Sequence, residues 1–463
     1  MKTLLSNLSL KSYEKIWTNI LWDSTILKAI KKGIEIFHEK NSILLENSII
    51  AKYCQQIALF FTLVLIFLSP LVSTEKNAIL VIIAALFTLL KIFLNKIQLQ
   101  DNILLLSVLL YMAVGLVAVG FSPYFSLAVK GYLKMIIYFI AYLIFLSNLN
   151  NLNNIKITIW TLVIIATIVS INGFIQFHWI KPPPLALWDD PETLVEFTRV
   201  YSFLGNPNLL AGYLIPCIAM SIVFYFVNSG WKKLIILLSL FFQISCLYYT
   251  YSRGSWIGLF LSILAISYCL LNIHWTSIKK SRACQILLIS ICIFIIVVGI
   301  YFIMTSESIH TRFLSLFAGR EHSSNSFRLN VWLSTLQMIK DNWIIGIGPG
   351  NDVYKAIYAF YMVPGFTALG AYCIFLEVAV ELGIIGFITF LWMLFIHCIR
   401  ALWGIFQEIN YSLRLLLTGC LGAIIGLMGH GLVDTVWYRP QVQILFWFMM
   451  ALITILSRYV TLK

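Results

Sequence analysis

Three arginines stand at the ends of apolar stretches, and they are the residues best suited to binding an anion. Arg253 lies in YTYSRGSW, between two apolar runs, where a charge is costly and tends to mark a site. Arg320 and Arg328 flank the expected start of a helix in GREHSSNSFRLNVW. A guanidinium fork suits phosphate, carboxylate or bicarbonate oxygens, and a helix N-terminus adds to that attraction. The alternatives are an interface-snorkelling arginine at 253 and a solvated loop face at 320 and 328.

Two pairs of titratable residues are spaced four apart, which on a helix places both members on one face. His430 and Asp434 occur in GHGLVDTVWYRP. A carboxylate that orients an imidazole is a common general-base arrangement, but such a pair also packs two spans together. Glu377 and Glu381, in AYCIFLEVAVELG, are expensive in a membrane unless they are paired. They could pair with a loop arginine, act as a base or bind a cation.

The elements that must position these residues are transmembrane helices. The chain has 463 residues, of which 60% are hydrophobic and 11% charged, whereas a soluble domain carries about 25% charged residues. Apolar runs of about 20 residues are long enough to span a bilayer. We therefore predict an all-α integral membrane protein with about twelve spans. The spans are expected near 57–74, 79–95, 103–121, 132–148, 157–177, 209–227, 233–251, 254–272, 285–304, 378–399, 414–431 and 441–457.

The basic residues predict the topology. The net charge is +13, and most Lys and Arg of the short loops fall on one side, which orients both termini to the cytoplasm of an inner (plasma) membrane protein. Residues 1–53 are predicted to form a basic cytoplasmic segment, which is either an amphipathic helix on the membrane face or a solvated tail. Residues 54–463 form the membrane domain. Its outer loops are expected at about 178–208 and 305–371, the second with an amphipathic helix near 326–340.

Motifs for other classes of site are missing from the sequence. There is no Walker A sequence, HExxH, GxSxG or zinc-type Cys/His spacing, so we expect neither a metal nor a nucleotide cofactor. The glycines of IGIGPGND lack the context of a dinucleotide site and indicate a loop with open backbone amides. No basic groove interleaved with aromatic residues suggests nucleic acid. Membrane lipids are the expected partners, and the sequence leaves the oligomeric state open.

Several long segments together resemble the cyanobacterial IctB family, which is named for bicarbonate transport. They are TRVYSFLGNPNLLAGYLIP, LYYTYSRGSWIGL, GREHSSNSFRLNVWLSTLQMIKDNWIIGIGPGN, FTALGAYCIFLEVAVELG and MGHGLVDTVWYRP. That family in turn is similar to the O-antigen ligases and polymerases. The wider resemblance implies a many-span scaffold, arginines at Arg253 and Arg328 that hold a lipid diphosphate, and a loop histidine that acts as base. Here Tyr372 stands at the histidine position, and an unperturbed tyrosine is a poor base at neutral pH.

Three functions follow from the resemblance. The first is a bicarbonate or inorganic-carbon transporter, or an accessory to one. The second is a ligase or polymerase with a GT-C-like scaffold that acts on an undecaprenyl-diphosphate-linked saccharide at the outer face, with Glu377 or His430 in place of the loop histidine. The third is a non-catalytic assembly partner. A transporter should carry polar residues inward to the cytoplasmic side, with Pro216 as the main candidate for a helix break. A ligase should instead show a cavity that is open to the outer leaflet and lined by Arg253 and Arg328.

Overall fold

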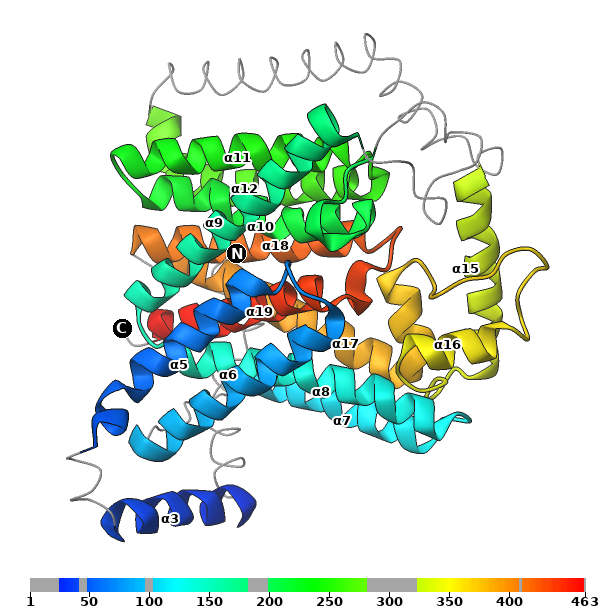
Figure 1. Cartoon of the computed structure of the whole chain (residues 1–463), viewed down its shortest axis with the longest axis horizontal. Coiled ribbons are helices and arrows are strands. Elements are labelled where there is room, and N and C mark those ends of the chain that lie inside the picture. Colours follow the sequence, from blue (N-terminus) through cyan, green and yellow to red (C-terminus); the bar gives the residue numbers. More distant parts are fainter. Residues whose placement is uncertain are drawn as a thin grey trace.

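The computed structural model describes residues 25–40, 48–95, 103–181, 199–280, 323–407 and 410–461. Within these ranges the chain is all-α, and eleven helices are long and apolar enough to cross a membrane. The expected span at 285–304 lies outside the described residues, as does Arg320. The predicted fold class is confirmed, and Figure 1 shows the helices packed as one bundle.

The helices that cross the bundle and the shorter elements between them have the following bounds. They are α3 (Thr25–Lys40), α5 (Ile49–Leu68), α6 (Thr74–Asn95), α7 (Ile103–Gly120), α8 (Phe125–Asn148), α9 (Leu152–Ile175), the π-helical turn η2 (Gln176–Ile180), the 3₁₀ turn η3 (Ser202–Leu204), α10 (Pro207–Val227), α11 (Trp231–Tyr249), α12 (Arg253–Lys280), α15 (Ser323–Asp341), α16 (Asn351–Tyr358), α17 (Ile374–Gln407), α18 (Tyr411–His430), the 3₁₀ turn η5 (Val436–Tyr438) and α19 (Pro440–Thr461). The helix expected near 326–340 is therefore confirmed as α15.

The first expected span was placed too far along the chain. Helix α5 begins at Ile49, where the Ser48 side chain accepts from the amide of Ala51, and it ends at Leu68 instead of 74. The chain reverses there because the Asn77 side-chain amide donates to the carbonyls of Ser69 and Val72. Side-chain hydrogen bonds of this kind stop a helix that an apolar run alone would continue.

The N-terminal segment is helical where it is described. Helix α3 exposes Lys28, Lys32 and Lys40, and it buries His38, whose Nε2 lies 2.6 Å from the carbonyl of Phe93 at the end of α6. The helical alternative for this segment is thus confirmed over α3, while its place on the membrane face stays a prediction.

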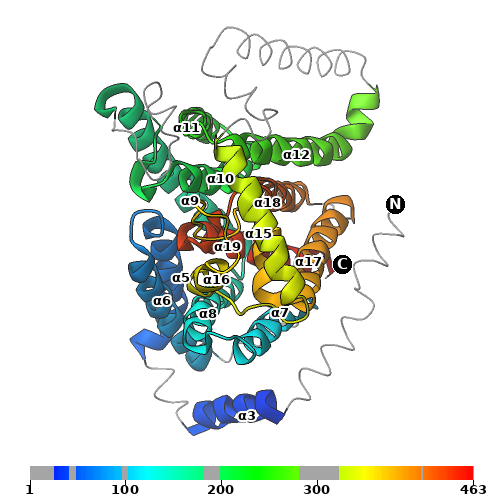
Figure 2. The same ribbon diagram turned by 90° about the vertical axis from the view of Figure 1, so that its right-hand side faces the viewer.

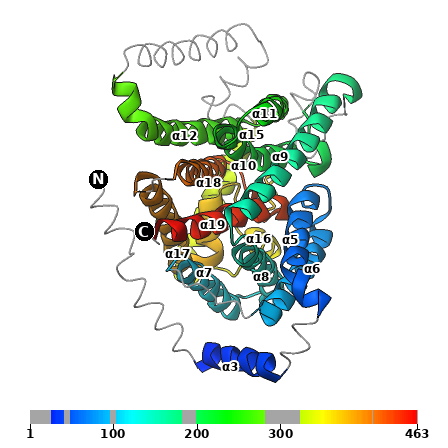
Figure 3. The same ribbon diagram turned by 90° about the vertical axis from the view of Figure 1, so that its left-hand side faces the viewer.

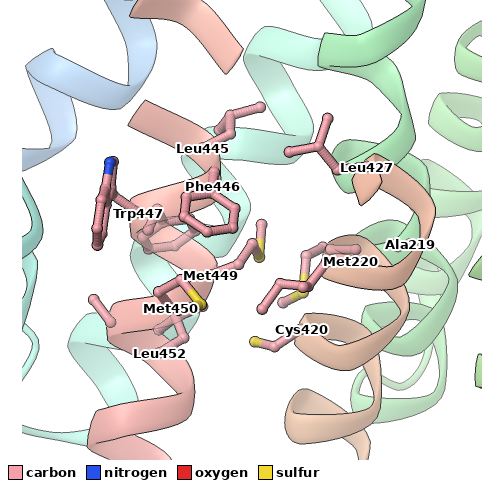
Figure 4. Packing of buried hydrophobic residues seen from close by; sticks show 14 of the residues in the cluster. Ala219, Met220, Cys420, Leu427, Leu445, Phe446, Trp447, Met449, Met450 and Leu452 are labelled. Atoms are coloured by element: carbon pink, nitrogen blue, oxygen red, sulfur yellow. The ribbon is translucent and has the colours of Figure 1, made fainter. Parts of the chain in front are cut away.

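Helix α19 is the centre of the bundle. Every residue in its most apolar 18-residue window is buried, and Figures 2 and 3 show it enclosed by α5, α8, α10, α17 and α18. Its Phe446, Met449 and Met450 lie opposite Met220 of α10 and Cys420 of α18 (Figure 4). Flexible methionines fill such irregular space between helices well. The sequence of a helix that is buried on all sides is apolar throughout, which is why this span could be predicted from the sequence.

The helix break expected at Pro216 is absent, because α10 continues through that residue. The break occurs instead at Gly383 of α17, whose φ is +65°. There the amide of Ile384 donates to the carbonyl of Trp343, and the amides of Ile347 and Gly348 donate to the carbonyls of Val380 and Glu381. The amides of the IGIGPGND loop that were expected to be open are therefore partly used to brace the broken helix.

Helices α15 and α16 lie at one end of the bundle, which we call the α15 end. Helix α15 packs on α17 and α16 packs on α8, and Figure 2 looks onto this end with α15 across the front. The start of α10 is built by the GNPN turn that the sequence predicted: Gly205 has φ +71°, and the Asn206 side chain accepts from the amides of Asn208 and Leu209. Pro207 takes the first helical position, which fixes Asn208 beside the end of α18.

Candidate active site

The candidate site lies at the α15 end, around the segment that joins α18 to α19. Asp434 is its centre: Oδ2 accepts from the side-chain amide of Asn208 at 2.7 Å, and Oδ1 accepts from the amide of Thr435 at 2.7 Å. Nη2 of Arg328, on α15, lies 3.8 Å from Oδ2. Elements more than a hundred residues apart in sequence therefore meet at one carboxylate.

Two more arginines belong to elements that border this site. Arg199 donates from Nε to the carbonyl of Thr250 at 2.9 Å and from Nη2 to the side-chain oxygen of Asn208 at 2.8 Å. Arg253 is the first residue of α12 and is 9% exposed. The adjoining Gly254 packs against His430 and Val433 of the α18–α19 segment. Arg328 and the start of α12, where Arg253 stands, thus both lie next to the α18–α19 segment, and a helix N-terminus itself attracts anions.

Arg199 is a site residue that reasoning from the sequence missed. It lies in TRVYSFLGNPN, one of the segments that carried the resemblance, but nothing in its spacing points to Asp434. Its contact with Asn208 depends on how α10 and the stretch before it fold back on each other. The only sequence signal was a charge immediately before an ordered turn.

The expected His430–Asp434 pair is wrong. Helix α18 ends at His430 and the chain turns over residues 431–433, so Asp434 leaves the helical face that spacing predicted. The imidazole is fully buried and neither ring nitrogen has a hydrogen-bond partner. It lies instead where Gly212, Gly254 and Gly258 make room, since a Cβ at Gly254 would stand 2.8 Å from its Cδ2.

Glu377 and Glu381 do lie on one face of α17, and among the described residues they pair with a tyrosine and not with a loop arginine. The hydroxyl of Tyr438 donates to Oε1 of Glu377 and, at 2.6 Å, to Oε1 of Glu381. The backbone amide of Ala371 donates to Oε2 of Glu377 at 2.7 Å, and the amide of Gly350 donates to Oε1 of Glu381 at 2.8 Å. Burial, followed by the two carboxyl groups, raises the pKa of Tyr438 well above its ordinary value, so the phenol stays a donor.

Tyr372 is held in an unusual conformation beside these carboxyl groups. Its φ is +50°, a region that non-glycine residues rarely occupy. Two hydrogen bonds hold this turn in place: the amide of Ala371 donates to Glu377, and the amide of Ile374 donates to the carbonyl of Gly431. Burial, then the Asp434 charge, raises the pKa of Tyr372 to about 12. A phenol in this state is protonated throughout the physiological range and cannot take a proton.

The fold and this cluster define a multi-pass membrane protein that gathers arginines and carboxylates at one end of its bundle. Within it, residues 238–391 match the family model described as O-Antigen ligase. That stretch runs from α11 into α17 and includes Arg253, Arg328, Tyr372 and both glutamates. The scaffold is therefore O-antigen ligase-like, and the narrower likeness to the IctB family stays a prediction. No curated protein matches the chain.

Proposed function

We propose that this protein transfers a saccharide from a polyprenyl diphosphate carrier to an acceptor hydroxyl, at an α15 end that faces the outside of the plasma membrane. The observation that carries the proposal is that Arg328 and the start of α12, where Arg253 stands, both lie next to the α18–α19 segment. Both arginines belong to the stretch that matches O-Antigen ligase. Two guanidinium forks can each engage a phosphate through paired hydrogen bonds. They stabilise the diphosphate that leaves when the sugar is transferred.

Binding of the carrier tests this proposal. Purified protein in nanodiscs is expected to bind polyprenyl diphosphate more tightly than polyprenyl monophosphate, because the diphosphate carries more negative charge and offers a separate phosphoryl group to each arginine. Arg253→Ala should weaken diphosphate binding by about tenfold or more, since hydrogen bonds to charged groups contribute about 1.5–3 kcal/mol.

The matched control is Lys355→Ala, which removes an exposed cation of α16 at the same end and should leave the affinity unchanged. Equal affinity for the two lipids, together with no effect of Arg253→Ala, would contradict the proposal.

Tyr372→Phe is expected to keep transfer within about threefold of the wild type. A phenol whose pKa is raised to about 12 supplies no proton acceptor, so removing its hydroxyl costs little. Because the shift is upward, the wild-type rate should also show no step from tyrosine ionisation as pH rises from 7 to 10. A loss of about 100-fold in Tyr372→Phe, or a step near pH 10 that this variant abolishes, would show that the hydroxyl takes part.

A second candidate is transport of bicarbonate or another form of inorganic carbon, which the IctB resemblance implies. Polar groups that continue along the bundle support this second candidate. The Thr454 hydroxyl lies 3.0 Å from the Tyr142 hydroxyl and 3.4 Å from Nε2 of His397. Arg400 is fully buried one turn further along α17, and ionisable residues within spans commonly mark a translocation path.

Labelled-bicarbonate uptake into proteoliposomes that hold only this protein tests the second candidate. Uptake above that of empty vesicles, lost in Arg253→Ala, would support transport with the arginine in its anion site. No uptake by folded protein would exclude autonomous transport.

A further inference from the structure

Transfer of a sugar to a hydroxyl requires a group that accepts the hydroxyl proton, and the described residues at the α15 end narrow the choice. Tyr372 remains protonated, and the His430 ring is fully buried among glycines. Glu377 is 1% exposed, so its carboxyl group is not accessible to an acceptor hydroxyl. Asp434 is more accessible than Glu377 and His430, because the residue is 8% exposed and its Oδ2 lies next to Arg328.

The carboxylate of Asp434 is oriented and still has room for a proton. Each of its oxygens has two lone pairs, and each accepts one hydrogen bond, from Asn208 and from the amide of Thr435. Arg199 donates to the Asn208 side-chain oxygen, so the NH₂ group of that amide must face Asp434. The orientation of the carboxylate is therefore fixed from two elements, which is the usual requirement for a positioned base.

Resting on the function proposed above, we propose that Asp434 is the base of the transfer and that Arg328 restrains it until the donor arrives. The acceptor oxygen attacks the anomeric carbon of the donor sugar and its proton passes to Oδ2 of Asp434. The bond from that carbon to the diphosphate oxygen breaks, and the polyprenyl diphosphate leaves with its electron pair, next to Arg253 and Arg328. The proton then passes from Asp434 to water.

The ion pair between Arg328 and Asp434 gives this step an order. The guanidinium of Arg328 lies 3.8 Å from Oδ2 and balances the charge of the carboxylate. A diphosphate carries more negative charge than one carboxylate and therefore competes for Arg328. Once the guanidinium turns to the diphosphate, Oδ2 is free to accept a proton. Donor binding and release of the base are thus the same event.

Asp434→Asn in the full-length protein tests both parts. Without the competing carboxylate, binding of polyprenyl diphosphate should tighten by up to about fivefold, the range of an exposed ion pair. Transfer from lipid-linked saccharides extracted from the source membranes, followed as release of polyprenyl diphosphate, should fall at least about 100-fold. Asp434→Glu keeps a carboxylate and should retain more transfer than Asp434→Asn.

The control is Asp352→Asn, in the exposed first turn of α16, which should change neither readout. Transfer by Asp434→Asn within about threefold of the wild type would overturn the role as base. Diphosphate binding that is unchanged or weaker in Asp434→Asn would overturn the restraint by Arg328. Failure of the wild type to bind polyprenyl diphosphate would instead refute the proposed function itself, so the two failures are distinguishable.

Discussion

Arg328→Ala is expected to lower saccharide transfer at least about 100-fold. The side chain is placed by α15 within 3.8 Å of Asp434, and in the proposed reaction it meets the charge that develops on the leaving diphosphate. Removing one preorganised donor to such a charge typically costs about 10²–10³ in rate. Arg328→Lys should recover only part of the loss, because an ammonium is a point charge and lacks the fork that engages two oxygens.

Release of polyprenyl diphosphate by purified protein measures this effect. Lys340→Ala is the matched control, since Lys340 is an exposed cation near the end of the same helix. If Lys340→Ala slowed release as much as Arg328→Ala, the effect would reflect general charge at this surface. A rate within threefold of the wild type in Arg328→Ala would remove Arg328 from the site.

Gly383→Ala is expected to destabilise the protein by roughly 3 kcal/mol. Its φ of +65° and ψ of −168° belong to a region that is essentially restricted to glycine and costs other residues about 1–3 kcal/mol. An added Cβ would also stand 2.6 Å from the amide nitrogen of Ile345. Such a contact forces backbone shifts that typically cost a further 1–3 kcal/mol. The break in α17 and its bonds to the 343–348 loop would be strained together, and this loop leads into α16 at the α15 end.

Thermal unfolding in detergent compares this variant with Gly120→Ala. Gly120 ends α7 in open surroundings, with nothing within 4 Å of an added Cβ, so alanine there should leave the melting temperature nearly unchanged. Equal melting temperatures for the two variants would show that the break at Gly383 tolerates a side chain.

The spans could be predicted from the sequence because their signal is local. A run such as 441–457 is apolar on every side, and in the structure α19 is buried on every side. The GNPN turn and α15 could likewise be predicted from local capping residues and helical periodicity. The end of α5 was misplaced because it depends on Asn77, a side chain that comes from the next helix.

The site was predictable only in part, because its contacts join distant segments. Arg253 and Arg328 stood out in the sequence as charges near apolar runs, and the structure places Arg328 next to Asp434. The partner of Glu377 could not be inferred, since Tyr438 lies 61 positions away. Spacing alone also paired His430 with Asp434, but α18 ends between them. Helical spacing predicts a shared face only while the helix continues.

The most direct test of the central claim is a single assay on the purified protein in liposomes. Lipid-linked saccharides extracted from the source membranes are added with acceptor glycan, and the appearance of free polyprenyl diphosphate is followed over time. The proposed function predicts release that depends on the acceptor and that Arg253→Ala and Arg328→Ala both abolish. Folded wild-type protein that binds the lipid but releases no diphosphate, or release that both variants retain, would contradict it.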